Sequence, residues 1–332
     1  MYWMNIMIEV EKLGKYNKPT RGKKEMNKKI SLIIPCFNEE EALEIFYPEV
    51  KKVLDSMDYE YELLFVNDGS KDNTLEILKK LSKKDKNVKY LSFSRNFGKE
   101  SAMYAGFCNV DGDYVAVMDA DMQDPPSLLP KMLEILESKE YDSVATRRET
   151  REGEPVIRSW FARRFYEIIN KISDADIVDG ARDFRLMKKD MVDAIVSMSE
   201  YNRFSKGIFG WIGFKTYWLA YENIERVAGK TKWNFWKLFK YAIDGIVSFS
   251  EFPLNIASYL GVVVTLFGFI LMIIDLIQEI SLTISVILII GGIQLICMGI
   301  MGKYIAKNYA ESKNRPHYII AETNKKDIKK IN

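Results

Sequence analysis

Short apolar runs alternate with helical segments between residues 29 and 146, and this alternation restricts the fold more than any other feature. The runs are rich in β-branched and aromatic residues and cover 29–35, 61–67, 88–94, 113–119 and 141–146. Helical patterns lie between them, at 40–56, 73–84, 99–109 and 127–139. Strands that alternate with helices at this spacing form βαβ units with right-handed crossovers. The sequence therefore predicts an α/β domain whose mostly parallel sheet is covered by helices on both faces.

Acidic and amide side chains stand directly after three of these predicted strands. The carboxyl ends of parallel strands meet at one edge of a sheet, where ligands gather, so we expect these side chains to lie together. They are Asn38, Glu39, Asp68, Asp119, Asp121, Gln123 and Asp124. The segment NDGSKDNT after the second strand has an ordinary alternative role, because its residue types also make turns and cap helices.

The end of the fourth strand carries the strongest signal, the segment MDADMQDPP. Three carboxylates close together repel one another unless a cation is present. Carboxylate and amide oxygens suit Mg²⁺ or Mn²⁺, and Mg²⁺ commonly binds one or two carboxylates together with the phosphates of a substrate. The segment therefore predicts a divalent-metal site. Pro125 and Pro126 are predicted to stop the strand and to start the next helix.

Charge and composition exclude several other functions. The chain has 48 basic and 46 acidic residues, which argues against a nucleic-acid-binding protein. Its three cysteines have no CxxC spacing, so neither a disulfide framework nor a zinc site is predicted. The only histidine, His317, lies in a charged C-terminal segment, which disfavours a histidine base. No glycine-rich loop of the P-loop or dinucleotide type occurs, so a metal is expected to neutralise a departing nucleoside diphosphate.

Two long stretches contain no charged residue, one between Glu251 and Asp275 and one between Glu279 and Lys303. As helices with a rise of about 1.5 Å per residue, each extends roughly 34 Å and exceeds a hydrocarbon core of about 30 Å. They predict transmembrane helices at 252–276 and 280–302. Lysines flank the pair but are absent from its connector, so both ends are predicted to face the cytoplasm. The alternative is a pair of buried helices in a soluble protein.

The remaining segments complete the predicted organisation. Residues 1–27 begin with a short apolar run, become polar and lysine-rich from Glu9 onward, and predict a poorly ordered extension. Residues 28–231 are predicted to form the catalytic domain, and residues 303–332 a basic cytoplasmic tail. Segments 155–172 and 232–250 mix aromatic with basic residues and predict amphipathic helices at the lipid interface. Their cations, Arg163 and Arg164 among them, would face the phosphate of a lipid acceptor. The alternative is that both are ordinary helices packed on the sheet.

A series of motifs follows along residues 28–320: PCFNEE, VNDGSKDNT, SRNFGKESAMYAGF, MDADMQDPP, DFRLM, ERVAGKTKW and KNRPHY. In this order they resemble the family 2 glycosyltransferases of the dolichol-phosphate-mannose synthase type. The chain is especially similar to the bacterial polyprenyl-phosphate glycosyltransferases with two C-terminal spans. The resemblance implies a Rossmann-like GT-A nucleotide-sugar domain that transfers a sugar from a nucleotide sugar to a polyprenyl phosphate, with inversion at the anomeric carbon.

The resemblance also implies roles for single residues. The residues that would bind the donor are Pro35, Asn38, Glu39, Asp68, Asp119, Arg185, Arg226 and Lys232. Within the pattern DxDxQ, Asp121 and Gln123 would hold the metal and Asp119 would lie beside the nucleotide sugar. Arg147 would bind the acceptor phosphate. Asp119, Asp121 and Asp183 are therefore the candidate catalytic residues.

Two of these implications stay open. Asp183 could act as a general base, but a polyprenyl phosphate is already negatively charged near neutral pH and needs binding more than deprotonation. Arg182 stands where related sequences often have Gly, and it is given no role. Thr231 takes the place of the usual Ser and keeps its hydroxyl group.

The sequence thus predicts a membrane enzyme, a polyprenyl-phosphate hexosyltransferase of the cell membrane. Its donor would be UDP-glucose or UDP-N-acetylglucosamine, its acceptor undecaprenyl phosphate, and its product would serve modification of a cell-envelope glycan. A homo-oligomer is expected from the glycines of the second span, and a flippase acting on the product is a further possible partner. A processive polysaccharide synthase is disfavoured, because no QxxRW segment occurs. The non-enzymatic alternative is a membrane-anchored nucleotide-sugar-binding protein.

Overall fold

A computed structural model describes residues 28–138, 140–148, 178, 180–221 and 283–328, and isolated positions between 243 and 274. Several predictions fall on other residues and lie outside this description: the extension at 1–27, the interfacial helices at 155–172 and 232–250, and most of the first span at 252–276. The same holds for four candidate site residues, Arg163, Arg164, Arg226 and Lys232.

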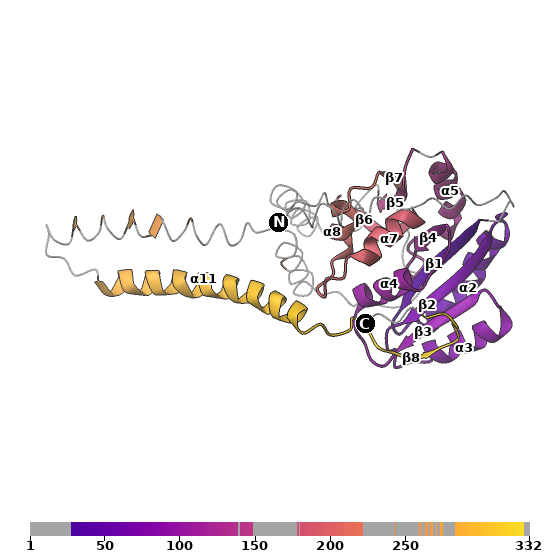
Figure 1. The fold of residues 1–332 in the computed structure, drawn as a ribbon, viewed down its shortest axis with the longest axis horizontal. Helices are drawn as coiled ribbons and strands as arrows, with labels where there is room; N and C mark the ends of the chain where they lie inside the picture. Colours follow the sequence, from indigo (N-terminus) through magenta and orange to yellow (C-terminus); the bar gives the residue numbers. More distant parts are fainter. Residues whose placement is uncertain are drawn as a thin grey trace, which may run out of the picture.

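The described chain folds around an eight-stranded sheet with the order β7-β5-β6-β4-β1-β2-β3-β8 (Figure 1). Four neighbouring strands are parallel: β1 (Lys29–Cys36), β2 (Glu60–Asn67), β3 (Val88–Phe93) and β4 (Tyr114–Val117). With β5 (Ser143–Arg148), they match the five strands that the apolar runs predict. The prediction of an α/β domain with a mostly parallel sheet is confirmed for the described residues.

Two strands that the apolar pattern does not predict complete one side of the sheet. β6 (Ala181–Lys188) lies between β4 and β5 and runs antiparallel to both, and β7 (Thr216–Tyr221) runs parallel to β5. In the register of β4 and β6, Val117 pairs with Arg185. The start of β6 therefore lies beside the end of β4, which brings Arg182 and Asp183 to the acidic segment.

Helices cover both faces of the sheet, as predicted. They are α2 (Glu40–Asp55), α3 (Thr74–Lys84), α4 (Lys99–Cys108), α5 (Leu129–Glu137), α7 (Lys189–Ser197) and α8 (Ser205–Trp211). Apolar residues of α2, α3 and α5 share one buried cluster with Leu32, whereas those of α4, α7 and α8 share the other with Ile33. Successive side chains of a strand point to opposite faces, so a sheet covered twice requires continuous apolar strands.

The acidic segment after β4 differs from the prediction in one respect. β4 ends at Val117, well before Pro125, so the prediction that the two prolines stop this strand is wrong. After Val117 the backbone leaves the strand. The side chains of the acidic segment then form hydrogen bonds within the segment and with other elements. Pro126 does begin a short 3-10 helix, 126–128, that leads into α5, as the fixed φ of proline favours at a helix start.

The described C-terminal part of the chain is a long helix followed by a strand that joins the sheet. The helix α11 (Thr283–Ser312) extends away from the sheet, and β8 (Ile320–Thr323) then pairs antiparallel with β3 at the sheet edge (Figure 1). Residues 303–312 therefore belong to a helix, and β8 was not predicted for the tail. Within the described residues, no helix has both the length and the apolar character required to cross a membrane, so the predicted hairpin is unconfirmed.

His317 helps to anchor this returning segment. Its Nε2 lies 3.2 Å from the carbonyl oxygen of Ser199, and its ring packs against Tyr104 and Tyr201. The next residue, Tyr318, stacks on Phe93 with ring centroids 5.0 Å apart. Burial lowers the pKa of His317 below its ordinary value, so the folded protein holds this side chain neutral at pH values where the unfolded chain is protonated.

This difference gives a pH-dependent stability. As the pH falls below about 6.5, the unfolded state binds a proton that the folded state does not, so stability should decrease. We expect the unfolding temperature to fall between pH 7.5 and pH 5.5, and His317→Phe to reduce that fall while keeping an aromatic ring at the same place. His317 is the chain's only histidine, so no second imidazole complicates the comparison. An unchanged pH dependence in the variant would contradict this role.

Candidate active site

The segment after β4 makes a tight turn that brings two candidate metal ligands together. Met122 adopts the left-handed conformation with φ of 60°, which is uncommon for a residue other than glycine. Asp121 is 8% exposed, and its Oδ1 accepts a hydrogen bond of 3.1 Å from the backbone N–H of Gln123. The turn thus presents a carboxylate and an amide within a single reversal of the chain.

Lys99, the first residue of α4, joins two of the candidate catalytic acids. Its Nζ lies 2.7 Å from Asp119 Oδ1 and 2.5 Å from Asp183 Oδ2. Burial by itself would raise the pKa of Asp183, but Lys99, Lys206 and Arg182 outweigh it and hold that pKa well below its usual range. Burial likewise opposes the charge of Lys99, and the two carboxylates outweigh it and raise the lysine pKa. Lys99 and Asp183 are therefore both ionised at neutral pH.

A second basic residue, Arg182, holds the far end of the acidic segment. Its Nε donates to Asp124 Oδ1 at 3.0 Å, and its Nη2 donates to Gln123 Oε1 at 3.3 Å. The hydroxyl of Tyr221 donates to the same oxygen of Asp124 at 2.5 Å. Asp124 is 1% exposed, and burial raises its pKa even against the pull of Arg182. Its other oxygen, Oδ2, has no hydrogen-bond partner among the described residues.

Arg185 is more deeply buried than Arg147, the other candidate phosphate-binding residue that the structure describes. It is 3% exposed, and its guanidinium carbon lies 3.7 Å from the ring centroid of Phe209 and 5.9 Å from that of Trp218. Its Nε has no hydrogen-bond partner within the described part of the chain. Burial lowers its pKa to about 9. Such a cation is costly to bury unless an anion completes its surroundings.

Arg147 lies at the same end of the sheet, in a different environment. It is exposed on β5, and in the register with β6 it pairs with Ala181, which directly precedes Arg182. An exposed arginine beside a cluster of acids and buried cations can meet an anion that arrives from solvent. The structure therefore places Arg147 near the site without giving it a ligand.

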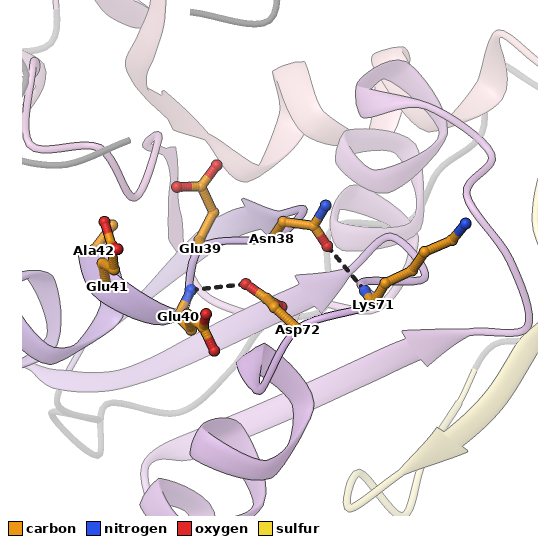
Figure 2. Close-up of a pocket in the computed structure, with 7 residues that line it drawn as sticks. All are labelled: Asn38, Glu39, Glu40, Glu41, Ala42, Lys71 and Asp72. Carbon is orange, nitrogen blue, oxygen red and sulfur yellow. Dashed lines mark hydrogen bonds between the residues drawn. The ribbon is translucent and has the colours of Figure 1, made fainter. Parts of the chain in front are cut away.

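The first candidate loop borders a hollow of about 390 Å³ at the N-terminal end of α2 (Figure 2). Asn38, with φ of 53°, accepts a hydrogen bond of 2.8 Å at Oδ1 from the backbone N–H of Lys71. The backbone N–H of Glu40 donates to Asp72 Oδ2 at 3.2 Å. These bonds tie the loop after β1 to the loop after β2. The hollow is lined by Asn38, Glu39, Glu40, Glu41, Ala42, Lys71 and Asp72.

Asp68 has a structural task in this arrangement. Its Oδ1 accepts from the backbone N–H of Phe97 at 2.6 Å, and its Oδ2 accepts from Gly98 N–H and Asn96 Nδ2, both at 2.9 Å. Burial raises the pKa of Asp68, and the two backbone donors oppose that effect. Asp68 thereby fixes the loop that leads into α4 and Lys99. The contact with a nucleotide base that the resemblance implies stays a prediction.

Gly69 allows the loops after β2 and β3 to approach each other. Its φ is 64°, and a Cβ at this position would lie 2.3 Å from the backbone carbon of Arg95. We expect Gly69→Ala to lower the free energy of unfolding by more than about 1 kcal/mol, because strain and overlap add. The matched control is Gly213→Ala, which has a similar φ of 72° and no atom within 4 Å of the added Cβ. Chemical denaturation of both variants measures the difference, and equal losses would contradict the close approach.

Comparison with known proteins identifies the chain's family. Residues 31–196, which contain the acidic segment and Asp183, match the glycosyl transferase family 2. The chain belongs to this family. It is therefore a glycosyltransferase, and the mixed, mostly parallel sheet represents the GT-A-like α/β fold that the resemblance implied.

Relatives of similar length extend the match beyond the family domain. A prophage bactoprenol glucosyl transferase homolog of Escherichia coli (strain K12) is 44% identical over 307 residues, which cover 90% of this chain and 100% of the relative. The bactoprenol glucosyl transferase of Shigella phage SfV is 42% identical over 308 residues, with 90% and 100% covered. These names are consistent with the polyprenyl-phosphate branch of the resemblance.

Among solved structures, a mannosyltransferase from Pyrobaculum calidifontis in complex with GDP-Man and Mn²⁺ aligns with a TM-score of 0.47. The sequence identity is 13%, and the alignment covers 74% of this chain and 70% of the other.

The acids of this glycosyltransferase fit a divalent cation that is completed by substrate. The described residues contain no group of three or more His, Cys, Asp and Glu side chains able to hold a metal by themselves. Asp121 and Gln123 instead provide one carboxylate and one amide oxygen from a single turn, and a cation bound there would take the amide oxygen from Arg182 Nη2, which now donates to it at 3.3 Å. Asp124 Oδ2 is also buried and has no hydrogen-bond partner among the described residues. A small protein donor set with room for substrate phosphates is the way in which Mg²⁺ commonly binds.

The sequence pattern missed three residues that organise this site: Lys99, Arg182 and Tyr221. Lys99 lies in the quoted motif SRNFGKESAMYAGF, directly after the glycine that precedes α4, and a lone cation at a helix start was its only local signal. The sequence marks Arg182 only by its departure from the Gly that related sequences often have. Tyr221 carries no local signal, because its contact with Asp124 joins residues 97 positions apart.

Proposed function

We propose that this glycosyltransferase transfers glucose from UDP-glucose to undecaprenyl phosphate or a similar polyprenyl phosphate, with inversion and with help from a divalent cation. The names of the bactoprenol glucosyl transferases support glucose as the sugar and a polyprenyl phosphate as the acceptor. The observation that carries the proposal is the meeting of the Asp121–Gln123 turn with several cations at the end of β4. A site with fixed acids and nearby cations suits an anionic donor and an anionic acceptor.

The chain's own residues would bind and orient the two substrates. A polyprenyl phosphate is its own nucleophile, so no side chain has to remove a proton from it. The low pKa of Asp183 agrees with this, because a carboxylate held far below its usual range is a weak base. Arg147 and Arg185 are the described arginines available for phosphate groups. A divalent cation on Asp121 and Gln123 would neutralise charge on the departing nucleoside diphosphate.

We also propose that the protein works at the cell membrane, with the catalytic domain and both chain ends on the cytoplasmic side. The two charge-free stretches of the sequence support this. The apolar side chains of α11 support it as well, since Leu295, Ile296 and Met298 are 70%, 60% and 66% exposed. Exposed apolar surface of this kind marks contact with a lipid or a protein. A homo-oligomer, a flippase partner and a role in cell-envelope glycan modification are further, separate proposals.

A transfer assay tests the proposed reaction. Membranes that contain the protein are incubated with a polyprenyl phosphate and either radiolabelled UDP-glucose or radiolabelled UDP-N-acetylglucosamine. We expect the label from UDP-glucose to enter a lipid that organic solvent extracts and mild acid cleaves. If label were transferred only from UDP-N-acetylglucosamine, the proposed sugar would be wrong but the proposed type of reaction would stand. No transfer from any common donor would favour the alternative, a binding protein without turnover.

A further inference from the structure

One ammonium group connects three elements of the candidate site. Lys99 begins α4, Asp119 follows β4, and Asp183 lies near the start of β6. Lys99 Nζ lies 2.7 Å from an oxygen of Asp119 and 2.5 Å from an oxygen of Asp183. The two carboxylates therefore face each other across a single cation, and without it they would repel.

The position of Lys99 is fixed on both sides along the chain. Before it, the backbone N–H groups of Phe97 and Gly98 bond to Asp68. After it, Glu100 Oε2 accepts hydrogen bonds from the backbone N–H of Ser205, at 3.0 Å, and from its hydroxyl group. These bonds hold the start of α4 between the loop after β2 and helix α8. The lysine therefore enters the acid cluster from a fixed backbone.

This arrangement differs from an ordinary surface ion pair. Exposed ion pairs contribute about 0–1 kcal/mol to the stability of the fold, because solvent screens the attraction and both side chains lose conformational freedom. The side chains of Asp119 and Asp183 are only 26% and 19% exposed, and although the Lys99 side chain is 39% exposed, this one cation serves both acids. Other charges also reach Asp183, since Lys206 and Arg182 attract it, whereas Glu100 repels it. Among the ion pairs of the described residues, Lys99 alone contacts both acids directly.

We propose that Lys99 is a positioning residue for sugar transfer, which holds Asp119 at the donor side of the site and keeps Asp183 engaged as its second anchor. Asp183 then acts through Lys99 and does not serve as the general base. This inference rests on the proposed function, because the donor side is defined by it. It assigns a task to a lysine that the motif comparison left without one.

Four proteins form the decisive test: the full-length wild type, Lys99→Met, Asp183→Asn and the double variant, assayed for kcat and KM with UDP-glucose and polyprenyl phosphate. We expect Lys99→Met to lower kcat about 30-fold or more, with the KM for the acceptor changed less than about 3-fold. Asp183→Asn should lower kcat less, by about 10-fold at most. In the Lys99→Met background, Asp183→Asn should lower kcat no further, because the effects of residues that act as a unit are non-additive.

Two further variants separate charge from structure. Lys99→Arg keeps the charge and should recover at least about a third of the activity lost in Lys99→Met. The control is Lys189→Met, which removes a partly exposed lysine of α7 that pairs with Asp193 away from the site, and its activity should stay within about twofold of the wild type. A loss of about 100-fold or more for Asp183→Asn in both backgrounds would identify a general base and overturn the proposal. Failure of Lys99→Arg to exceed Lys99→Met would overturn it as well.

Thermal unfolding of the same proteins distinguishes this inference from the proposed function. If the wild type transfers no sugar, the proposed function fails, but the pairing is still tested by the unfolding temperatures. Non-additive shifts of Lys99→Met and Asp183→Asn would support the pairing, and additive shifts would contradict it. If Lys99→Met does not fold, the activity of Asp183→Asn alone tests the role of Asp183. A loss of kcat of about 100-fold or more is expected of a general base and not of an anchor for Lys99.

Discussion

Replacing Asp121 by alanine should reduce sugar transfer at least about 1,000-fold while the domain stays folded. Asp121 is the one carboxylate in the turn that also presents the amide of Gln123, and its Oδ1 already organises that turn through the backbone N–H of Gln123. Alanine removes both the charge and this bond. The measurement is radiolabelled transfer to lipid, together with direct binding of Mn²⁺ by electron paramagnetic resonance, and both signals should be lost.

A matched control uses an acid outside the site. Asp111 is a carboxylate with a side chain 74% exposed, paired with Lys29, the first residue of β1. Asp111→Ala should leave transfer and Mn²⁺ binding within about twofold of the wild type, because an exposed pair contributes little. If Asp121→Ala kept more than a tenth of the activity, the turn after β4 would not be the centre of the reaction.

Replacing Arg185 by methionine should separate activity from stability. The guanidinium packs against the ring of Phe209 and lies near that of Trp218, and its Nε has no hydrogen-bond partner among the described residues. An apolar side chain of similar length avoids the cost of burying that charge, so we expect the free energy of unfolding to stay equal or to rise by about 1–4 kcal/mol. Transfer should nevertheless fall about 100-fold or more, because an anionic substrate loses its buried cation.

The two readouts of Arg185→Met distinguish function from structure. A residue kept only for the fold would show lost stability and lost activity together, whereas a substrate-binding residue shows lost activity in a protein at least as stable as the wild type. Chemical denaturation and transfer kinetics on the same preparation decide between them. A variant that is destabilised but retains its kcat and KM would assign Arg185 to the fold alone.

Local pattern was enough to predict the parallel half of the sheet. The strands β1 to β4 are largely apolar because helices cover both faces of the sheet, and the helices α2, α3 and α5 each keep an amphipathic period. The strand β6 does not show this apolar pattern, because its sequence ARDFRLMK places two arginines and an aspartate in a central strand. β8 is only four residues long and lies in a charged segment, so its pairing with β3 is a long-range property.

In the candidate site, too, local sequence pattern predicts some features, whereas others depend on long-range contacts. The acids were predictable, because the ends of parallel strands meet at one edge whatever the intervening sequence. Their counter-charges were not, since Lys99 and Asp183 lie 84 positions apart and Arg182 and Asp124 lie 58 apart. Which cation meets which acid depends on where β6 enters the sheet. The antiparallel insertion of β6 beside β4 provides those pairings.

Metal-dependent glucosylation of a lipid phosphate is the central claim, and one titration tests it most directly. The purified full-length protein is stripped with a chelator and incubated with radiolabelled UDP-glucose and undecaprenyl phosphate, while Mg²⁺ or Mn²⁺ is added in steps. The expected result is a labelled, acid-labile lipid that is absent without metal and rises to saturation with it, and that requires the phosphate group of the acceptor. Equal labelling with and without metal, or none at any metal concentration, would contradict the account.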